Sequence, residues 1–219
     1  MNIQPDLLSS NYLFPSTLYF IDKPNFITDI GPVVDGYLDE ARKDVKPEDY
    51  QSLVQSANFP DDPKVSEFVS YIAQTSWNLL QEQGFDMEKS STFVSEMWAQ
   101  EHSLGSGHSE HVHSHGAQLT GFYVIDAPDN SSKFMFHDPR SGKRQIHLLE
   151  KDNKLATIAS NAISYTPVKG QFYFFNSYIP HEITRNVSTD LFKIIHFNVS
   201  VFATPPVQTT STAKPAEII

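Results

Sequence analysis

The sequence contains no cysteine, which excludes disulfide bridges and every zinc site that uses cysteine ligands. Basic residues are also scarce: 16 Lys and Arg stand against 26 Asp and Glu, giving a formal net charge of −10. Because a nucleic-acid interface needs clustered Lys and Arg, this balance argues against nucleic acid as a partner. The chain also lacks a long apolar run and a basic leader, so we expect a soluble, cytoplasmic protein with no membrane partner.

What the sequence does contain is enough apolar material for one sizeable core. The 219 residues are 39% hydrophobic and 12% aromatic, which is typical of a single globular domain. Residues 12–22 indicate an extended segment. Apolar side chains then recur at helical spacing from Pro24 to Ala41 and again from Val65 to Leu80, where Gly84 ends the pattern. We therefore expect residues 1–90 to form an N-terminal helical support.

After residue 90 the pattern changes to short β-type segments separated by turn residues. The predicted strands are 92–101, 110–114, 118–126, 132–137, 144–149, 162–166, 171–176, 181–185 and 191–202. Strands that follow helices predict an α+β fold, in which a jelly-roll core over 91–203 carries the helices on one sheet. We expect one domain over 1–203, followed by a flexible Pro/Thr-rich tail over 204–219.

A histidine-rich stretch within this β region carries the strongest functional signal. Alternate side chains of a strand point to the same face, so His111 and His113 are expected to share a pocket, with His115 beside them and Glu110 pointing away. His181, from a distant strand, would complete a set of three imidazoles with open coordination positions. Neutral imidazole suits iron(II), zinc, copper and nickel alike, so the residues alone leave the metal open.

Two segments around these histidines resemble the 2-oxoglutarate/iron(II)-dependent oxygenase superfamily, which has a double-stranded β-helix core. The branch found in bacteria and phages is similar in its H-x-H segment, [ST]-G-aromatic-Tyr strand, Asp-Pro-Arg turn, G-x-x-x-x-F strand and distal histidine. Here these elements are His111–His113, Thr120–Tyr123, Asp138–Arg140, Gly170–Phe175 and His181. The resemblance covers roughly the C-terminal half of the chain.

This resemblance implies that His111, His113 and His181 hold iron(II), with open positions for 2-oxoglutarate and O₂ and with no catalytic residue beyond the ligands. His113 takes the place where the superfamily usually has a carboxylate, which leaves the metal's identity open. The far carboxylate of 2-oxoglutarate needs a cation inside the barrel, because burying an unpaired anion is costly. The candidates for this cation are Lys193, which is slightly favoured, and Arg185.

Two further residues, Gln100 and His102, alternate onto one strand face and are expected to hydrogen-bond the cosubstrate. The implied activity is hydroxylation of a substrate C–H bond, with succinate and CO₂ as co-products. A protein side chain such as proline is the leading substrate, followed by a nucleobase and then a free small metabolite. The sequence leaves the oligomeric state open, a homodimer included.

Three alternatives remain at this stage. Gly105 followed by His111 and His113 matches the start of a cupin motif, although Gln118 stands near the place of the expected glutamate. A three-His zinc hydrolase is chemically sensible, since zinc lowers the pKa of its bound water to about 7. The last alternative is a non-catalytic jelly-roll structural protein.

Overall fold

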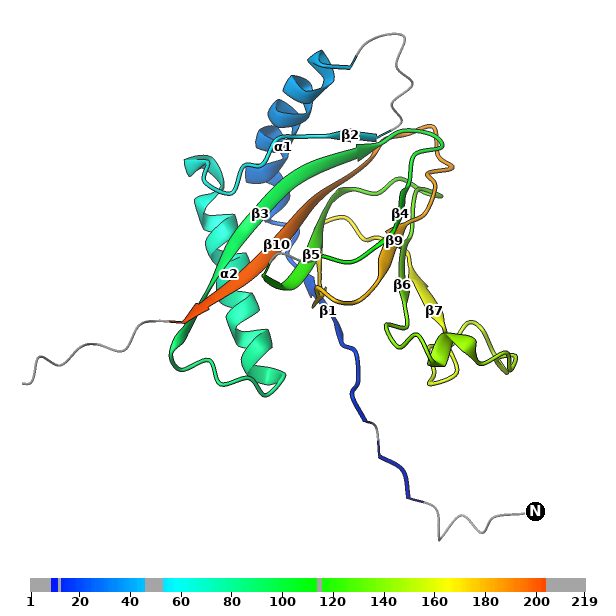
Figure 1. The fold of residues 1–219 in the computed structure, drawn as a ribbon. Coiled ribbons are helices and arrows are strands. Elements are labelled where there is room, and N and C mark those ends of the chain that lie inside the picture. The colour runs from blue at the N-terminus through cyan, green and yellow to red at the C-terminus, as the bar shows by residue number, and fades with distance from the viewer. Residues whose placement is uncertain (1–8, 12, 46–52, 114–115, 204–219) are drawn as a thin grey trace, which may run out of the picture.

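The computed structural model describes residues 9–11, 13–45, 53–113 and 116–203. Within them, two antiparallel sheets face each other and two α-helices, α1 (Phe26–Lys43) and α2 (Ser66–Glu82), cover one of the sheets (Figure 1). The strands are β1 (Leu18–Asp22), β2 (Leu53–Gln55), β3 (Ser90–His102), β4 (His108–His111), β5 (Ala117–Asp126), β6 (Phe134–His137), β7 (Ala162–Tyr165), β8 (Gln171–Asn176), β9 (His181–Ile183) and β10 (Phe192–Ala203).

The large sheet has the strand order β1-β8-β5-β10-β3-β2, and the small sheet has the order β4-β9-β6-β7. This is the predicted jelly-roll arrangement, with helices on one sheet only. No helix of the described residues is long and apolar enough to span a membrane.

The helices form because an apolar stripe repeats along each of them at helical spacing. In α1 the buried residues include Ile30, Val34 and Leu38, each four residues after the last. Phe68 of α2 lies 5.2 Å from Tyr123 of β5 and 5.4 Å from Phe172 of β8, measured between ring centroids. These contacts bury the outer face of the large sheet beneath the helices, as the spacing of the apolar residues predicts.

A second core lies between the two sheets and is largely aromatic. The rings of Phe122 (β5) and Phe134 (β6) stack at 4.5 Å, which joins the large sheet to the small one. Alternation along β10 divides its side chains between the two cores: Ile195 lies in the helix-side core, and Ile194 lies in the core between the sheets. The neighbouring interior position beyond Ile194 is His196, so the strand period brings polar residues into the barrel.

Gly121 explains part of the motif on β5. A Cβ at this position would lie 2.2 Å from the carbonyl oxygen of Tyr173 and 2.4 Å from the ring of Phe197. Only glycine lets β8 and the Phe197 ring approach β5 this closely. Gly170 enters β8 with a φ of +78°, in the left-handed region that favours glycine.

Several sequence-based boundaries need correction. The predicted strand 144–149 is wrong: a short 3-10 helix (Lys143–Gln145) is followed by irregular chain in which Leu148 and Leu149 are 83% and 97% exposed. Its apolar residues resemble a strand in the sequence, but no partner strand covers them. Residues 1–90 are also not purely helical, because β1 and β2 form the two edges of the large sheet. The predicted tail over 204–219 lies outside the described residues.

Candidate metal centre

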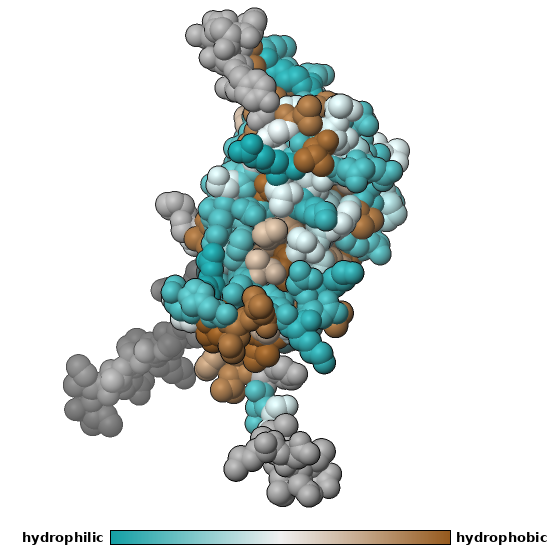
Figure 2. Space-filling model, turned by 90° about the vertical axis from the view of Figure 1, so that its right-hand side faces the viewer, coloured by the Kyte–Doolittle hydropathy of each residue, from teal (hydrophilic) through white to brown (hydrophobic). Residues whose placement is uncertain are grey.

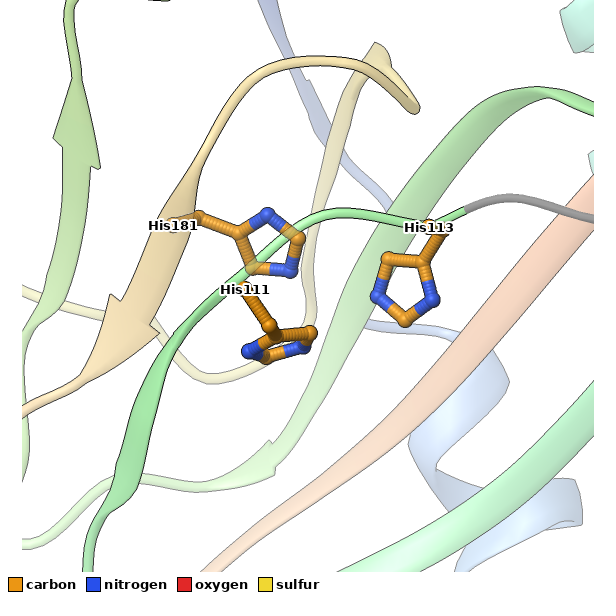
Figure 3. Close-up of side chains that lie close together, drawn as sticks. All are labelled: His111, His113 and His181. Atoms are coloured by element: carbon orange, nitrogen blue, oxygen red, sulfur yellow. The ribbon is translucent and has the colours of Figure 1, made fainter.

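Three imidazoles meet at one end of the space between the sheets. His111 is the last residue of β4 and is the cross-strand partner of His181, the first residue of β9. His113 lies two residues beyond β4, where its backbone N–H donates to the carbonyl of Ser177 at 3.0 Å. One ligand atom from each histidine lies within 4.8 Å of the others, and Figure 3 shows the three side chains directed toward one another. The three histidines that the sequence predicts therefore form a group that could hold a metal ion.

The route by which His113 arrives differs from the expectation. The predicted strand over 110–114 ends at His111, so simple strand alternation does not account for the pair. The chain leaves the strand and His113 is held by the Ser177 contact instead. Glu110 does point to the outer face, as predicted, and its carboxylate accepts two hydrogen bonds from Arg144 at 2.9 and 3.1 Å. His115 lies outside the described residues.

Backbone carbonyls fix the orientation of two of the three rings. The Nδ1 of His111 lies 2.7 Å from the carbonyl oxygen of Ser109, and the Nδ1 of His181 lies 2.9 Å from that of Ile179. A carbonyl can only accept, so each Nδ1 carries the proton and each Nε2 keeps its lone pair. The Nε2 of His181 is buried and has no partner among the described residues. A metal ion would satisfy this atom, and hydrogen-bonded imidazoles of this kind are typical metal ligands.

Burial keeps the imidazoles of His113 and His181 neutral, which is the form that binds a metal. It lowers the pKa of His181 to about 3, although the hydrogen bond to the Ile179 carbonyl acts in the opposite direction. Burial likewise lowers the pKa of His113 to about 4, with a smaller contribution from the neighbouring His111 and His108. The rings of Phe175 and Phe122, at 4.7 and 5.7 Å from that of His181, form the apolar wall behind the site.

The ring of His113 is held by side chains of the large sheet, whereas backbone carbonyls hold the rings of His111 and His181. Its Nε2 lies 3.0 Å from the Nε2 of His196, and its Nδ1 lies 3.4 Å from the Nδ2 of Asn198. The same Asn198 amide donates to the carboxylate of Glu96 at 2.7 Å. Trp98 stacks on His196 at 4.3 Å between ring centroids. The Glu96 carboxylate is therefore linked to the His113 ring through the Asn198 amide. In the family pattern, His113 stands where a carboxylate ligand is usual.

Two of these supporting residues escaped the sequence-based prediction. Glu96 and Trp98 were not singled out from the sequence. The sequence could have indicated both residues, because Glu96, Trp98 and Gln100 alternate along one strand and so share a face.

The structure places the predicted cosubstrate residues Gln100 and His102 together inside the barrel, facing the space between the sheets. They are 1% and 0% exposed. The Oε1 of Gln100 and the Nε2 of His102 are buried without a partner among the described residues, as is the Nε1 of Trp98. Buried polar atoms are normally hydrogen-bonded, so the Nε2 of His102 and the Nε1 of Trp98 fit the oxygen atoms of a polar ligand, whereas the Gln100 Oε1 can only accept.

The two predicted cations lie elsewhere. Lys193 sits on the helix side of β10, where its Nζ is 2.9 Å from Asp35 of α1 and 3.5 Å from Glu101 of β3. Arg185 follows β9, which ends at Ile183, and is exposed. The structure therefore brings neither cation to the three histidines. In the described part of the chain, no Lys or Arg is buried.

A cavity of about 430 Å³ lies between the N-terminal segment and the small sheet. Ile179, whose carbonyl holds His181, forms part of its wall, together with Phe136 and Tyr165 of the small sheet. The N-terminal segment contributes Phe14, which is 87% exposed and has a φ of +55°. Such a conformation is uncommon for a bulky residue.

Comparisons with known proteins agree with this geometry. Residues 96–198 match the family model described as "Putative 2OG-Fe(II) oxygenase". No curated protein sequence matches the chain. A prolyl-4-hydroxylase from Pseudomonas putida is similar in structure, with a TM-score of 0.54, 10% identity and coverage of 84% of this chain and 91% of that one.

The viral collagen prolyl hydroxylase of Paramecium bursaria Chlorella virus-1, in complex with 2-oxoglutarate, has a TM-score of 0.53 at 11% identity and covers 83% of this chain and 94% of its own. HygX from Streptomyces hygroscopicus, with nickel, 2-oxoglutarate and hygromycin B bound, has a TM-score of 0.54 at 9% identity and covers 84% and 83%. At these identities the likeness establishes the fold. None of the comparisons supports a cupin, a zinc hydrolase or a structural protein.

Proposed function

The chain belongs to the 2-oxoglutarate/iron(II)-dependent oxygenase superfamily, and from this premise we propose that His111, His113 and His181 bind the iron of a dioxygenase that hydroxylates a C–H bond. The observation that carries the proposal is the convergence of three imidazoles, two of which have their Nδ1 protons held by backbone carbonyls. Enzymes of this superfamily are oxidoreductases that need iron(II), 2-oxoglutarate and O₂.

When bound, iron(II) would supply the oxidising chemistry, in which 2-oxoglutarate is decarboxylated to succinate and CO₂ while the substrate gains a hydroxyl group. The chain's own residues would bind the ion, orient its ligands and exclude water from the site. The carbonyls of Ser109 and Ile179 direct the Nε2 lone pairs of His111 and His181 toward the ion. Asn198, which donates to Glu96, lies next to the Nδ1 of His113 and orients this third ring.

A direct test loads the purified, untagged protein with iron(II) under anaerobic conditions and measures succinate formation from 2-oxoglutarate after O₂ is admitted. We expect wild type to turn over 2-oxoglutarate slowly even without substrate. His181→Ala should lose this turnover and at least about tenfold in metal affinity, because the ion loses a ligand from a preorganised set. The matched control is His147→Ala, since His147 is an exposed histidine outside the strands. Tightly held zinc with no 2-oxoglutarate turnover would contradict the proposal.

For the substrate we propose a protein or peptide side chain, with proline as the first residue to test. The cavity beside Ile179 supports this choice, because it is of the size that holds small-molecule or side-chain ligands and is lined mainly by apolar residues. Exposed apolar side chains line it: Leu13, Phe14 and Ile158 are 70–87% exposed. Figure 2, which views the side opposite the helices, shows hydrophobic residues gathered in the lower part of this face. Two of the similar structures are of enzymes named prolyl hydroxylases.

The substrate class is tested with a proline-containing peptide and the same peptide with alanine in place of proline. We expect only the first to stimulate succinate formation above the substrate-free rate and to gain one oxygen atom by mass spectrometry. Ile158→Arg should raise the KM for the peptide and leave the substrate-free turnover unchanged, since Ile158 lines the cavity and is 72% exposed. Equal stimulation by both peptides, or by neither, would overturn the choice of proline.

A further inference from the structure

If 2-oxoglutarate binds inside the barrel, its far carboxylate needs a partner there, because burying an unpaired anion is costly. The two predicted cations, Lys193 and Arg185, do not lie inside the barrel. Lys193 points to the helix side and is already paired with two carboxylates. Its neighbour Phe192 occupies the interior position at the start of β10 and is fully buried. A one-residue difference in a strand reverses the face, so Lys193 cannot reach the barrel interior without breaking the register of β10.

The side chain directly across from Phe192 is His102 of β3. The two rings lie 5.7 Å apart between centroids, on the interior face of the large sheet. The Nδ1 of His102 is 2.8 Å from the hydroxyl oxygen of Ser106, which is itself fully buried. Its Nε2 is buried and has no partner among the described residues, and two positions earlier on the same face the Oε1 of Gln100 is also unpartnered.

We infer that His102, as an imidazolium, binds the far carboxylate of 2-oxoglutarate, so that cosubstrate binding takes up a proton. This inference rests on the proposed function. The Ser106 hydroxyl suits both states of the ring, because a hydroxyl oxygen can accept from a protonated Nδ1 or donate to an unprotonated one. The Nε2–H then remains free to donate to the carboxylate, in a charge-assisted hydrogen bond.

Among the residues that the structure describes, no carboxylate acts on His102 to hold its ring in the charged form before the cosubstrate binds. In the described residues, the titratable group that acts on it is His108, whose ring lies 4.3 Å from that of the ligand His111. Its chain neighbour Glu101 points to the opposite face, where Arg42 and Lys193 neutralise it. The remaining contacts of His102 are apolar or neutral: β2 pairs through Leu53, and the Asn186 amide donates to the His102 carbonyl.

Without ligand, burial lowers the pKa of His102 to about 4. A carboxylate at Nε2 would raise it, since a nearby opposite charge favours the ionised form. Between the two pKa values the ring is neutral in the free protein and charged in the complex, so affinity for 2-oxoglutarate should rise as the pH falls. A lysine or arginine anchor, by contrast, keeps its charge throughout this range.

The test compares 2-oxoglutarate with 2-oxopentanoate, which has a methyl group in place of the far carboxylate and the same metal-chelating end. Both are titrated calorimetrically into manganese(II)-loaded wild type at about pH 6 and about pH 8. Because the chelating ends are identical, the ratio of the two Kd values isolates the contribution of the far carboxylate. We expect the preference for 2-oxoglutarate to be at least about tenfold larger at the lower pH. Titrations in two buffers of different ionisation enthalpy should also show proton uptake with 2-oxoglutarate only.

His102→Gln should abolish the pH dependence of this ratio and leave the affinity for 2-oxopentanoate unchanged, and His147→Gln is the matched control. A ratio that does not change with pH, with no proton uptake by wild type, overturns the inference without requiring any variant to fold. In that case Lys193→Met and Arg185→Gln identify the permanent cation. Failure of both acids to bind the manganese protein at any pH contradicts the proposed function itself, so the two failures are distinguishable.

Discussion

The buried histidines predict a strong acid sensitivity of the metal-free fold. Burial lowers the pKa of His102 to about 4 and that of His181 to about 3, and both side chains are fully buried. In the unfolded chain their pKa returns to about 6.5. The unfolded state therefore binds more protons between these values, so the contribution to stability is complete above about pH 6.5 and is lost as the pH falls.

At about pH 5 each of these two imidazoles should lower the free energy of unfolding by roughly 2 kcal/mol relative to neutral pH, because one pKa unit corresponds to about 1.4 kcal/mol. The pair would then lower the free energy of unfolding by roughly 4 kcal/mol, a large part of the stability of a typical domain. Urea titrations of the metal-free protein, followed by circular dichroism at about pH 7.5 and about pH 5, should show the midpoint falling by more than about 1 M.

The matched variant is His102→Gln, which removes one of the buried titrating histidines and keeps a polar side chain. Its midpoint should be lower at neutral pH, and its loss of unfolding free energy between the two pH values should be smaller than that of wild type by the roughly 2 kcal/mol that His102 contributes. An equal pH dependence in wild type and variant, or a midpoint that does not move in wild type, would refute the reasoning that these rings are buried in the neutral form.

Three other changes give sharp expectations. Gly121→Ala should destabilise the fold by about 3 kcal/mol or more in urea titrations, because the new Cβ would overlap the ring of Phe197 and a backbone carbonyl that cannot move aside. Lys193→Met should cost only about 1 kcal/mol, since its ion pairs are partly solvated, and calorimetry should show metal affinity unchanged. Asn198→Ala should weaken metal binding by about tenfold in the same assay, because His113 loses a side chain that orients it.

The sequence predicted the helices and strands correctly where the spacing of apolar residues was regular. Helical spacing predicted α1 and α2, and β8 (171–176) was predicted with the bounds that the structure has. The 144–149 segment failed because local composition carries no information on whether a neighbouring strand exists to pair with it. The edge strand β2 shows the same limit in reverse, since the sequence pattern did not predict it and it pairs with the edge that β3 offers, whereas β1 lies within the extended segment expected over 12–22.

The candidate centre divides in the same way. The sequence by itself singled out His111, His113 and His181, because they are the residue types and spacings that a metal site needs, and the structure brings them together as a group that could hold a metal ion. Only the tertiary structure decided which residue at the start of β10 faces the barrel interior. Lys193 and Phe192 are adjacent in the chain, yet the register of β10 sends one toward the helices and the other into the barrel. Composition does not encode that choice of face, because it depends on which strands flank β10 and on the cores that cover its two sides.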